Sequence, residues 1–105
     1  LKVNFDPANM ILYDMGDPIH AVEILGQDIV HVHVKDARAP RTPGTWGEEV
    51  PLGQGQVGMS EFLEALAAME YSGPLVVERE AGDQVRRIED IRSGVLLLRK
   101  LITGA

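Results

Sequence analysis

The most informative absences in this 105-residue sequence are those of cysteine and of aromatic side chains. Without cysteine the chain forms no disulfide and has no thiolate chemistry, which is compatible with the cytoplasmic location that we expect. One Trp, two Tyr and two Phe are too few for a platform on which nucleobases stack. No apolar run approaches the roughly 20 residues of a membrane-spanning helix, and no basic segment with a cleavage site indicates secretion. We therefore expect no membrane partner and no nucleic-acid partner.

An excess of positive charge is also missing. The chain has 16 acidic and 10 basic residues, which gives a formal net charge of −6. Such a surface repels phosphate backbones, whereas clustered carboxylates can hold a metal cation. The apolar share of 45% and the charged share of 25% are typical of a folded domain and not of a disordered chain. The length allows one domain at most.

Short apolar segments alternate along the chain with longer amphipathic ones. Three segments rich in Val, Ile and Phe are typical of strands: 2–5, 29–34 and 75–78. Three others carry apolar residues at helical spacing, and they begin at Asp17-Pro18, near Ser60 and near Asp83. Gly94 weakens the last helix without necessarily ending it. The alternation predicts parallel strands joined by crossover helices.

The predicted strands differ in the polarity of their two faces. In the second strand Val30, Val32 and Val34 share one face, and the opposite face becomes polar toward the carboxyl end. Barrels place such inward polar residues at the carboxyl ends of their strands, and a (β/α)8 barrel takes roughly 250 residues. The fold class that we predict is therefore α/β, the C-terminal three βα units of a TIM barrel, with residues 1–105 forming one partial domain. The chain also begins in a strand without an initiator Met, which indicates a piece of a longer polypeptide.

One polar residue ends each predicted strand, and these three form the strongest candidate site. Asp6, His33 and Glu78 combine two carboxylates with one imidazole, a donor set suited to Mn²⁺, Mg²⁺, Co²⁺ or Zn²⁺. A divalent ion held there would polarise a sugar carbonyl or hydroxyl. Each residue taken alone is better explained as a polar side chain beside a loop, but three such residues on matching strand faces favour a site. Glu80 is an alternative to Glu78 as the ligand.

Several further residues near these strand ends are candidates for substrate contacts. His31 lies on the face of His33 and is either a supporting group or a buried core histidine. Lys35 would steady an oxyanion or a phosphate, or would pair with Asp36. Arg38 and Arg41 would grip an anionic substrate, or would be solvated loop charges. His20 is expected at the surface.

The connection 35–58 is long, rich in glycine and proline, and contains the only Trp, Trp46. We expect a loop there, with Trp46 as a lid residue or as a packing anchor. Its end, 53–58, matches G-x-G-x-x-G, but no buried strand directly precedes the first glycine. A dinucleotide site is therefore less favoured than a glycine turn that offers backbone N–H groups to a substrate phosphate.

The segments NFDPAN, HVHVKD, PLGQGQVG and GPLVVERE resemble the C-terminal third of the xylose isomerase-like sugar phosphate isomerase/epimerase superfamily. The resemblance implies strands six to eight of a (β/α)8 barrel and one divalent metal bound by Glu, Asp, His and Glu from strands five to eight. Asp6, His33 and Glu78 match three of these ligands, and the strand-five Glu has no counterpart. Asn9, three residues after the Asp, stands where epimerases of the family often have His.

Together these observations predict a metal-dependent isomerase or epimerase of a small sugar or sugar phosphate. In this reading Glu78 is both ligand and acid/base catalyst, Asp6 and His33 hold the metal, and Asn9 and Lys35 contact the substrate. One alternative is a non-catalytic metal-binding module of three units that self-assembles into a homo-oligomer, because its outer strands would have unpaired edges. Another is an NAD-binding α/β domain without metal.

Overall fold

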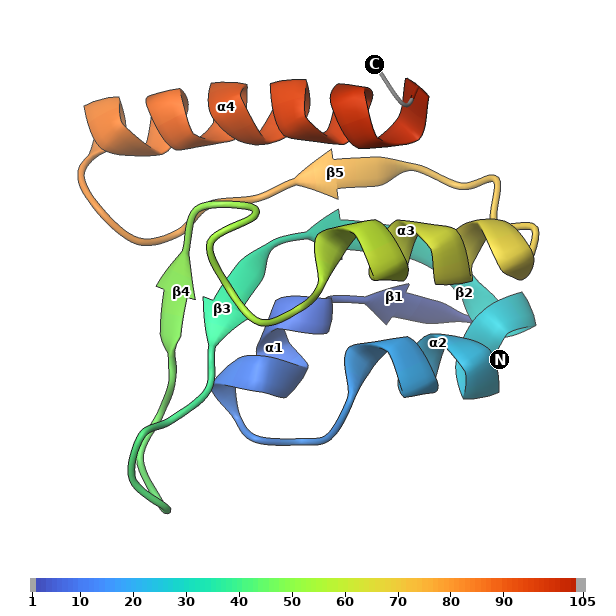
Figure 1. Ribbon diagram of the computed structural model, residues 1–105, viewed down its shortest axis with the longest axis horizontal. Helices are drawn as coiled ribbons and strands as arrows, with labels where there is room; N and C mark the ends of the chain where they lie inside the picture. Colours follow the sequence, from blue (N-terminus) through green and yellow to red (C-terminus); the bar gives the residue numbers. More distant parts are fainter. Residues whose placement is uncertain (1, 104–105) are drawn as a thin grey trace.

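The computed structural model describes residues 2–103. Strands and helices alternate as expected, with two additional strands and two additional short helical segments (Figure 1). The strands are β1 (Val3–Phe5), β2 (Ile29–Val34), β3 (Asp36–Arg38), β4 (Glu48–Val50) and β5 (Leu75–Val77). The helices are α1 (Pro7–Leu12), α2 (Pro18–Leu25), α3 (Met59–Ala68) and α4 (Gln84–Thr103), with a 3₁₀ turn at Gly26–Asp28.

The central sheet has three parallel strands in the order β1-β2-β5. Its core lies between β2 and the helices, where Val32, Val34 and Phe62 are fully buried and Phe62 meets Phe5 edge to face at 5.9 Å. One expectation about the faces is wrong: Ile29 is buried and Val30 is 41% exposed. The register passes from Val3↔Ile29 to Asn4↔His31, so Val30 is an extra residue in β2 and reverses the alternation before it.

Two of the helices begin with the same pair of residues. Asp6 and Asp17 are N-cap residues whose carboxylates accept a backbone N–H, and each is followed by a proline at the first helical position. The short α1 was not predicted, although Asp6-Pro7 carries the signal that predicts α2. Because α1 starts at the end of β1, the cap holds Asp6 at the carboxyl edge of the sheet.

The long connection 35–58 is not a plain loop, which corrects that expectation. It contains an antiparallel hairpin in which β3 pairs with β4, and the hairpin leaves the carboxyl end of β2 beside α1 (Figure 1). The backbone N–H of Gly47 donates to the carbonyl of Leu12 in α1 at 3.0 Å. The hairpin is thus attached to the sheet end where the candidate site lies.

The glycine turn that follows the hairpin is wrapped around one buried carboxylate. Asp36 is 1% exposed and accepts N–H bonds from Gly53 at 3.0 Å, Gly55 at 3.1 Å and Val57 at 3.2 Å, besides that of Ala37 at 2.9 Å. These N–H groups are therefore not free to bind a phosphate, and the proposed phosphate contact of this turn is wrong. The same arrangement removes the basis for the dinucleotide interpretation of the motif.

Helix α4 is continuous through Gly94, which is buried. A Cβ placed there would lie 2.7 Å from Leu52 Cδ1 and 3.2 Å from Val77 Cγ1. Gly94 thus allows α4 to lie close to β5, which explains a glycine inside a helix. Within residues 2–103, none of the helices has both the length and the apolar character needed to cross a membrane.

Candidate active site

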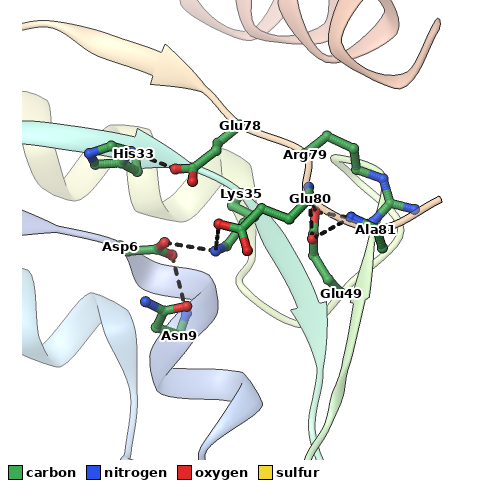
Figure 2. A network of polar contacts seen from close by, with 9 residues as sticks. All are labelled: Asp6, Asn9, His33, Lys35, Glu49, Glu78, Arg79, Glu80 and Ala81. Atoms are coloured by element: carbon green, nitrogen blue, oxygen red, sulfur yellow. Dashed lines mark hydrogen bonds and ion pairs between the residues drawn. The ribbon is translucent and has the colours of Figure 1, made fainter. Parts of the chain in front are cut away.

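The carboxyl ends of the three parallel strands bring five charged or titratable side chains into one cluster. Figure 2 shows Asp6 after β1, His33 on β2 and Lys35 just after it, and Glu78 and Glu80 after β5. The backbone N–H of Glu78 donates to the carbonyl of Val34 at 3.0 Å, which extends the pairing of β2 and β5 by one residue. The sheet itself therefore places these residues together, as the sequence pattern predicts.

His33 and Glu78 form a direct pair. The imidazole Nδ1 lies 2.5 Å from Oε2 of Glu78, and the two side chains are 36% and 31% exposed. The His31 ring lies 4.8 Å from the His33 ring, centroid to centroid, with a tilt of 45°. His31 is half-buried, so it supports the His33 ring and is not a fully buried core residue. The pair is accessible to a small molecule or an ion.

Lys35 is the central cation of the cluster. Its ammonium lies 3.0 Å from Asp6 Oδ2 and 3.5 Å from Glu80 Oε1, and the side chain is only 5% exposed. Burial opposes its charge, but the hydrogen bond and charge of Asp6, with the charges of Glu80 and Glu78, raise the pKa of Lys35 above its ordinary value. The alternative in which Lys35 pairs with Asp36 is wrong, because Asp36 binds backbone amides instead.

Glu80 lies at the outer side of the cluster, with its side chain 65% exposed. A hydrogen bond with Glu78 and the positive charge of Lys35 hold the pKa of Glu80 below its usual value. Glu80 therefore carries its negative charge wherever the pair with Lys35 forms. It belongs to the Lys35 side of the cluster, whereas Glu78 belongs to the His33 side.

Asp6 is bound to partners other than the His33–Glu78 pair. Its Oδ1 accepts the backbone N–H of Asn9 at 3.1 Å, and its Oδ2 faces Lys35. Within residues 2–103, no three side chains of His, Asp or Glu converge closely enough to hold a metal ion. The donor chemistry of His33 and Glu78 fits a divalent cation, and these two are already together. The third predicted ligand is paired with an ammonium instead.

The remaining candidates lie farther from the pair. Asn9 is in α1, where its backbone N–H donates to the Asp6 carboxylate (Figure 2). Arg38 is exposed on β3, not in a loop as expected. Trp46 is 80% exposed and meets Tyr13 edge to face at 6.1 Å, so it packs on α1's end and does not cover the strand ends. His20 is exposed, as predicted, and lies 3.8 Å from Glu23.

A group of charged residues beside the cluster was not found by sequence reasoning. Glu49 of β4 contacts Arg79 and the backbone that follows β5, and Arg79 in turn contacts Asp90 of α4. No local pattern indicates this group, because its members come from three distant segments. The available signal was their position in the sequence. Glu49 lies shortly before the glycine turn, and Arg79 directly follows the third predicted strand.

Comparison with known proteins identifies the architecture to which this site belongs. The family described as "Xylose isomerase-like TIM barrel" matches residues 1–101. A solved xylose isomerase domain protein from Planctomyces limnophilus is 45% identical, with a TM-score of 0.90, over 96% of this chain and 37% of that chain. No curated protein matches the sequence significantly.

Two more distant structures share the fold. A D-tagatose 3-epimerase-like protein is 24% identical with a TM-score of 0.73, over 98% of this chain and 35% of that chain. The mannonate dehydratase from Streptococcus suis serotype2 is 18% identical with a TM-score of 0.78, over 95% of this chain and 31% of that chain. The chain thus spans about a third of these proteins, which confirms the predicted fold class of three βα units of a TIM barrel. It belongs to the xylose isomerase-like TIM barrel family.

Proposed function

We propose that the protein is a divalent-metal-dependent isomerase or epimerase of a small sugar or sugar phosphate. The observation that carries the proposal is the His33–Glu78 pair, 2.5 Å apart and partly exposed at the carboxyl ends of parallel strands. In TIM-barrel enzymes this end of the sheet carries the active site. The chain belongs to the xylose isomerase-like TIM barrel family and shares its fold with a D-tagatose 3-epimerase-like protein, which supports this reaction class.

His33 and Glu78 are the residues that would hold the cation, and Asp6 would join them by turning from Lys35. Mn²⁺, Mg²⁺, Co²⁺ and Zn²⁺ all accept such nitrogen and oxygen donors. When bound, the cation supplies an electrophile that stabilises negative charge on a substrate oxygen. Lys35 would then remain paired with Glu80. The charges of the divalent cation and Lys35 would balance those of Asp6, Glu78 and Glu80.

Glu78 is the acid/base residue of this proposal. Its carboxylate takes a proton from the carbon next to the sugar carbonyl, and the C–H electron pair forms an enediolate. Protonation of that carbon from the opposite face, by a second acid/base group, gives an epimer, and protonation of the former carbonyl carbon gives an isomer. His31, Asn9 and Arg38 remain proposed substrate contacts. For Lys35, the contacts with Asp6 and Glu80 support a role as their counter-ion better than a direct substrate contact.

The test is deuterium exchange in D₂O. The full-length protein with Mn²⁺ is incubated with a panel of ketoses, aldoses and their phosphates, and NMR detects deuterium on the carbon next to the carbonyl. Glu78→Gln is expected to abolish the exchange, and the exposed Glu89→Gln is the control of equal charge change. Exchange that survives in Glu78→Gln would contradict the assigned base. No exchange with any sugar of the panel would contradict the proposed reaction.

A further inference from the structure

Glu49 lies outside the residues that we propose to contact metal or substrate, yet its carboxylate is directed at the same part of the sheet. The side chain is 9% exposed. Its Oε1 accepts the backbone N–H of Glu80 at 3.0 Å and that of Ala81 at 3.1 Å (Figure 2). The residues just after β5 therefore have their N–H groups bound by a side chain from the β3–β4 hairpin.

Arg79 connects this carboxylate to α4. Its Nη1 lies 3.1 Å from Glu49 Oε2 and its Nε lies 2.8 Å from Asp90 Oδ2. Burial opposes the charge of Arg79, but the hydrogen bond that it donates to Asp90 and its pairing with Glu49 raise its pKa above the ordinary value. Three elements, the hairpin, the segment after β5 and α4, are thus joined by charges removed from water. Breaking a buried pair of this kind costs more than breaking an exposed one.

The segment held in this way is the one that carries the candidate acid/base residue. Glu78 and Glu80 flank Arg79 directly. The backbone of Glu78 is fixed on one side by its N–H bond to Val34, and the following residues are fixed by Glu49. Glu80 then reaches Lys35, which holds Asp6. A displacement of Glu49 would therefore shift both carboxylates that we propose to bind the metal, Glu78 and Asp6.

We infer that Glu49 is a positioning residue of this site: through the N–H groups of Glu80 and Ala81 it sets where the Glu78 carboxylate stands relative to His33. The inference rests on the proposed function. Residues that orient metal ligands from behind typically contribute ten-fold or more to metal affinity. In Glu49→Gln the NH₂ group would face either Arg79 or the N–H groups of Glu80 and Ala81, donor against donor, so the segment after β5 would shift. We expect this variant to weaken Mn²⁺ binding about ten-fold.

The experiment is a calorimetric titration of the full-length, metal-free protein with Mn²⁺, well below the melting temperature of each variant. The matched control is Glu48→Gln, the neighbouring and exposed acid on the same strand. A second variant, Asp90→Asn, loosens Arg79 but leaves the contact of Glu49 with the segment after β5. We expect Asp90→Asn to lower the melting temperature with less than a two-fold change in Mn²⁺ affinity, which separates positioning from stability.

Weaker Mn²⁺ binding by Glu49→Gln, with Glu48→Gln unchanged, supports the inference. Unchanged binding by a folded Glu49→Gln overturns it and leaves the proposed function intact. If Glu49→Gln does not fold, Glu49→Asp, which keeps the charge but shortens the side chain, carries the same test. A wild-type protein that binds no Mn²⁺ overturns the proposed function itself, and the two failures are thereby distinguished.

Discussion

At the scale of single residues, two buried charges organise the carboxyl end of the sheet. Asp36 binds four backbone N–H groups, and Lys35 joins Asp6 to Glu80. The two residues are adjacent in sequence but have different partners, because successive side chains of an extended backbone point to opposite sides. Asp36 stabilises the glycine turn, whereas Lys35 balances the carboxylates of the candidate site.

Replacing Asp36 by Asn is expected to lower the free energy of unfolding by about 2–4 kcal/mol. The amide has one acceptor oxygen, so the N–H groups of Gly53 and Gly55 would face an NH₂ group and lose their buried partner. Urea denaturation measures the change, with the exposed Glu89→Gln as a control of equal charge change. A loss below about 0.5 kcal/mol, the range of ordinary surface substitutions, would contradict this role.

The contribution of Glu80 to stability should depend on pH in one direction. Its pKa is lowered in the folded state, so its stabilising effect is present above the ordinary value of 4.5 and is lost as the pH falls through the lowered pKa. Urea denaturation of wild type and Glu80→Gln between pH 7 and pH 3 tests this. The two curves should differ at pH 7 and converge at the acid end, and a gap that stays constant would contradict the account.

At the scale of elements, the glycine turn and the hairpin decide the shape of the site's border. Gly55 has no room for a side chain, since a Cβ would lie 2.2 Å from Asp36 Oδ1 and 2.5 Å from the carbonyl oxygen of Ala37. The need here is for space and not for an unusual backbone angle. The turn, the carboxylate and the first strand of the hairpin thus form one packed unit.

Gly55→Ala is therefore expected to destabilise the protein by about 2–3 kcal/mol, because overpacking forces backbone atoms apart. The neighbouring and exposed Gln54→Ala should change the free energy of unfolding by less than about 0.5 kcal/mol. Thermal melting of both variants gives the comparison. Equal melting temperatures for the two would show that the turn adjusts freely around the added methyl group.

Element prediction succeeded where the signal is local and failed where the partners are distant. Asp17-Pro18 and the apolar spacing after Ser60 predicted α2 and α3, because capping and periodicity are properties of neighbouring residues. The β3–β4 hairpin was missed because its two strands are only three residues long and contain charged residues. They also pair across a proline-containing connection, which gives no local strand signal. The bulge at Val30 also left no signal in the sequence, since register is set by the neighbouring strand.

The candidate site was predicted in its members but not in its pairing. Strand alternation and the carboxyl-end rule brought Asp6, His33 and Glu78 to one edge, which the structure confirms. The pairing within the site could not be foreseen. Lys35 pairs with Asp6 and Glu80 and not with its neighbour Asp36, and this depends on three-dimensional distances. The roles of Glu49 and Arg79 required knowledge of where the hairpin packs.

At the scale of the whole molecule, the three-stranded sheet is open on both sides among the described residues. Neither β1 nor β5 has a second neighbour within residues 2–103, and apolar side chains such as Val76, Ile88 and Leu96 are 41%, 51% and 59% exposed. A closed barrel would cover such edges with further strands and helices. The proteins of this fold to which the chain is similar are about three times as long.

The 105-residue chain produced by itself is accordingly expected to associate with copies of itself. Unpaired strand edges and apolar surface favour contact between copies. Sedimentation velocity at several concentrations would reveal species heavier than the 11.5 kDa monomer. A single monomeric species at all concentrations would contradict the expectation and would show that the open edges are protected.

The central claim is that His33 and Glu78 hold a divalent cation, and calorimetric titration of the full-length, metal-free protein with Mn²⁺ tests it most directly. His33→Ala should weaken binding by about ten-fold or more, since a ligand contributes at least as much as the groups that support it. His20→Ala, at an exposed position in α2, should bind as tightly as the wild type. Equal affinity of wild type and His33→Ala would contradict the claim, and the pair would then be an ordinary hydrogen bond at the end of the sheet.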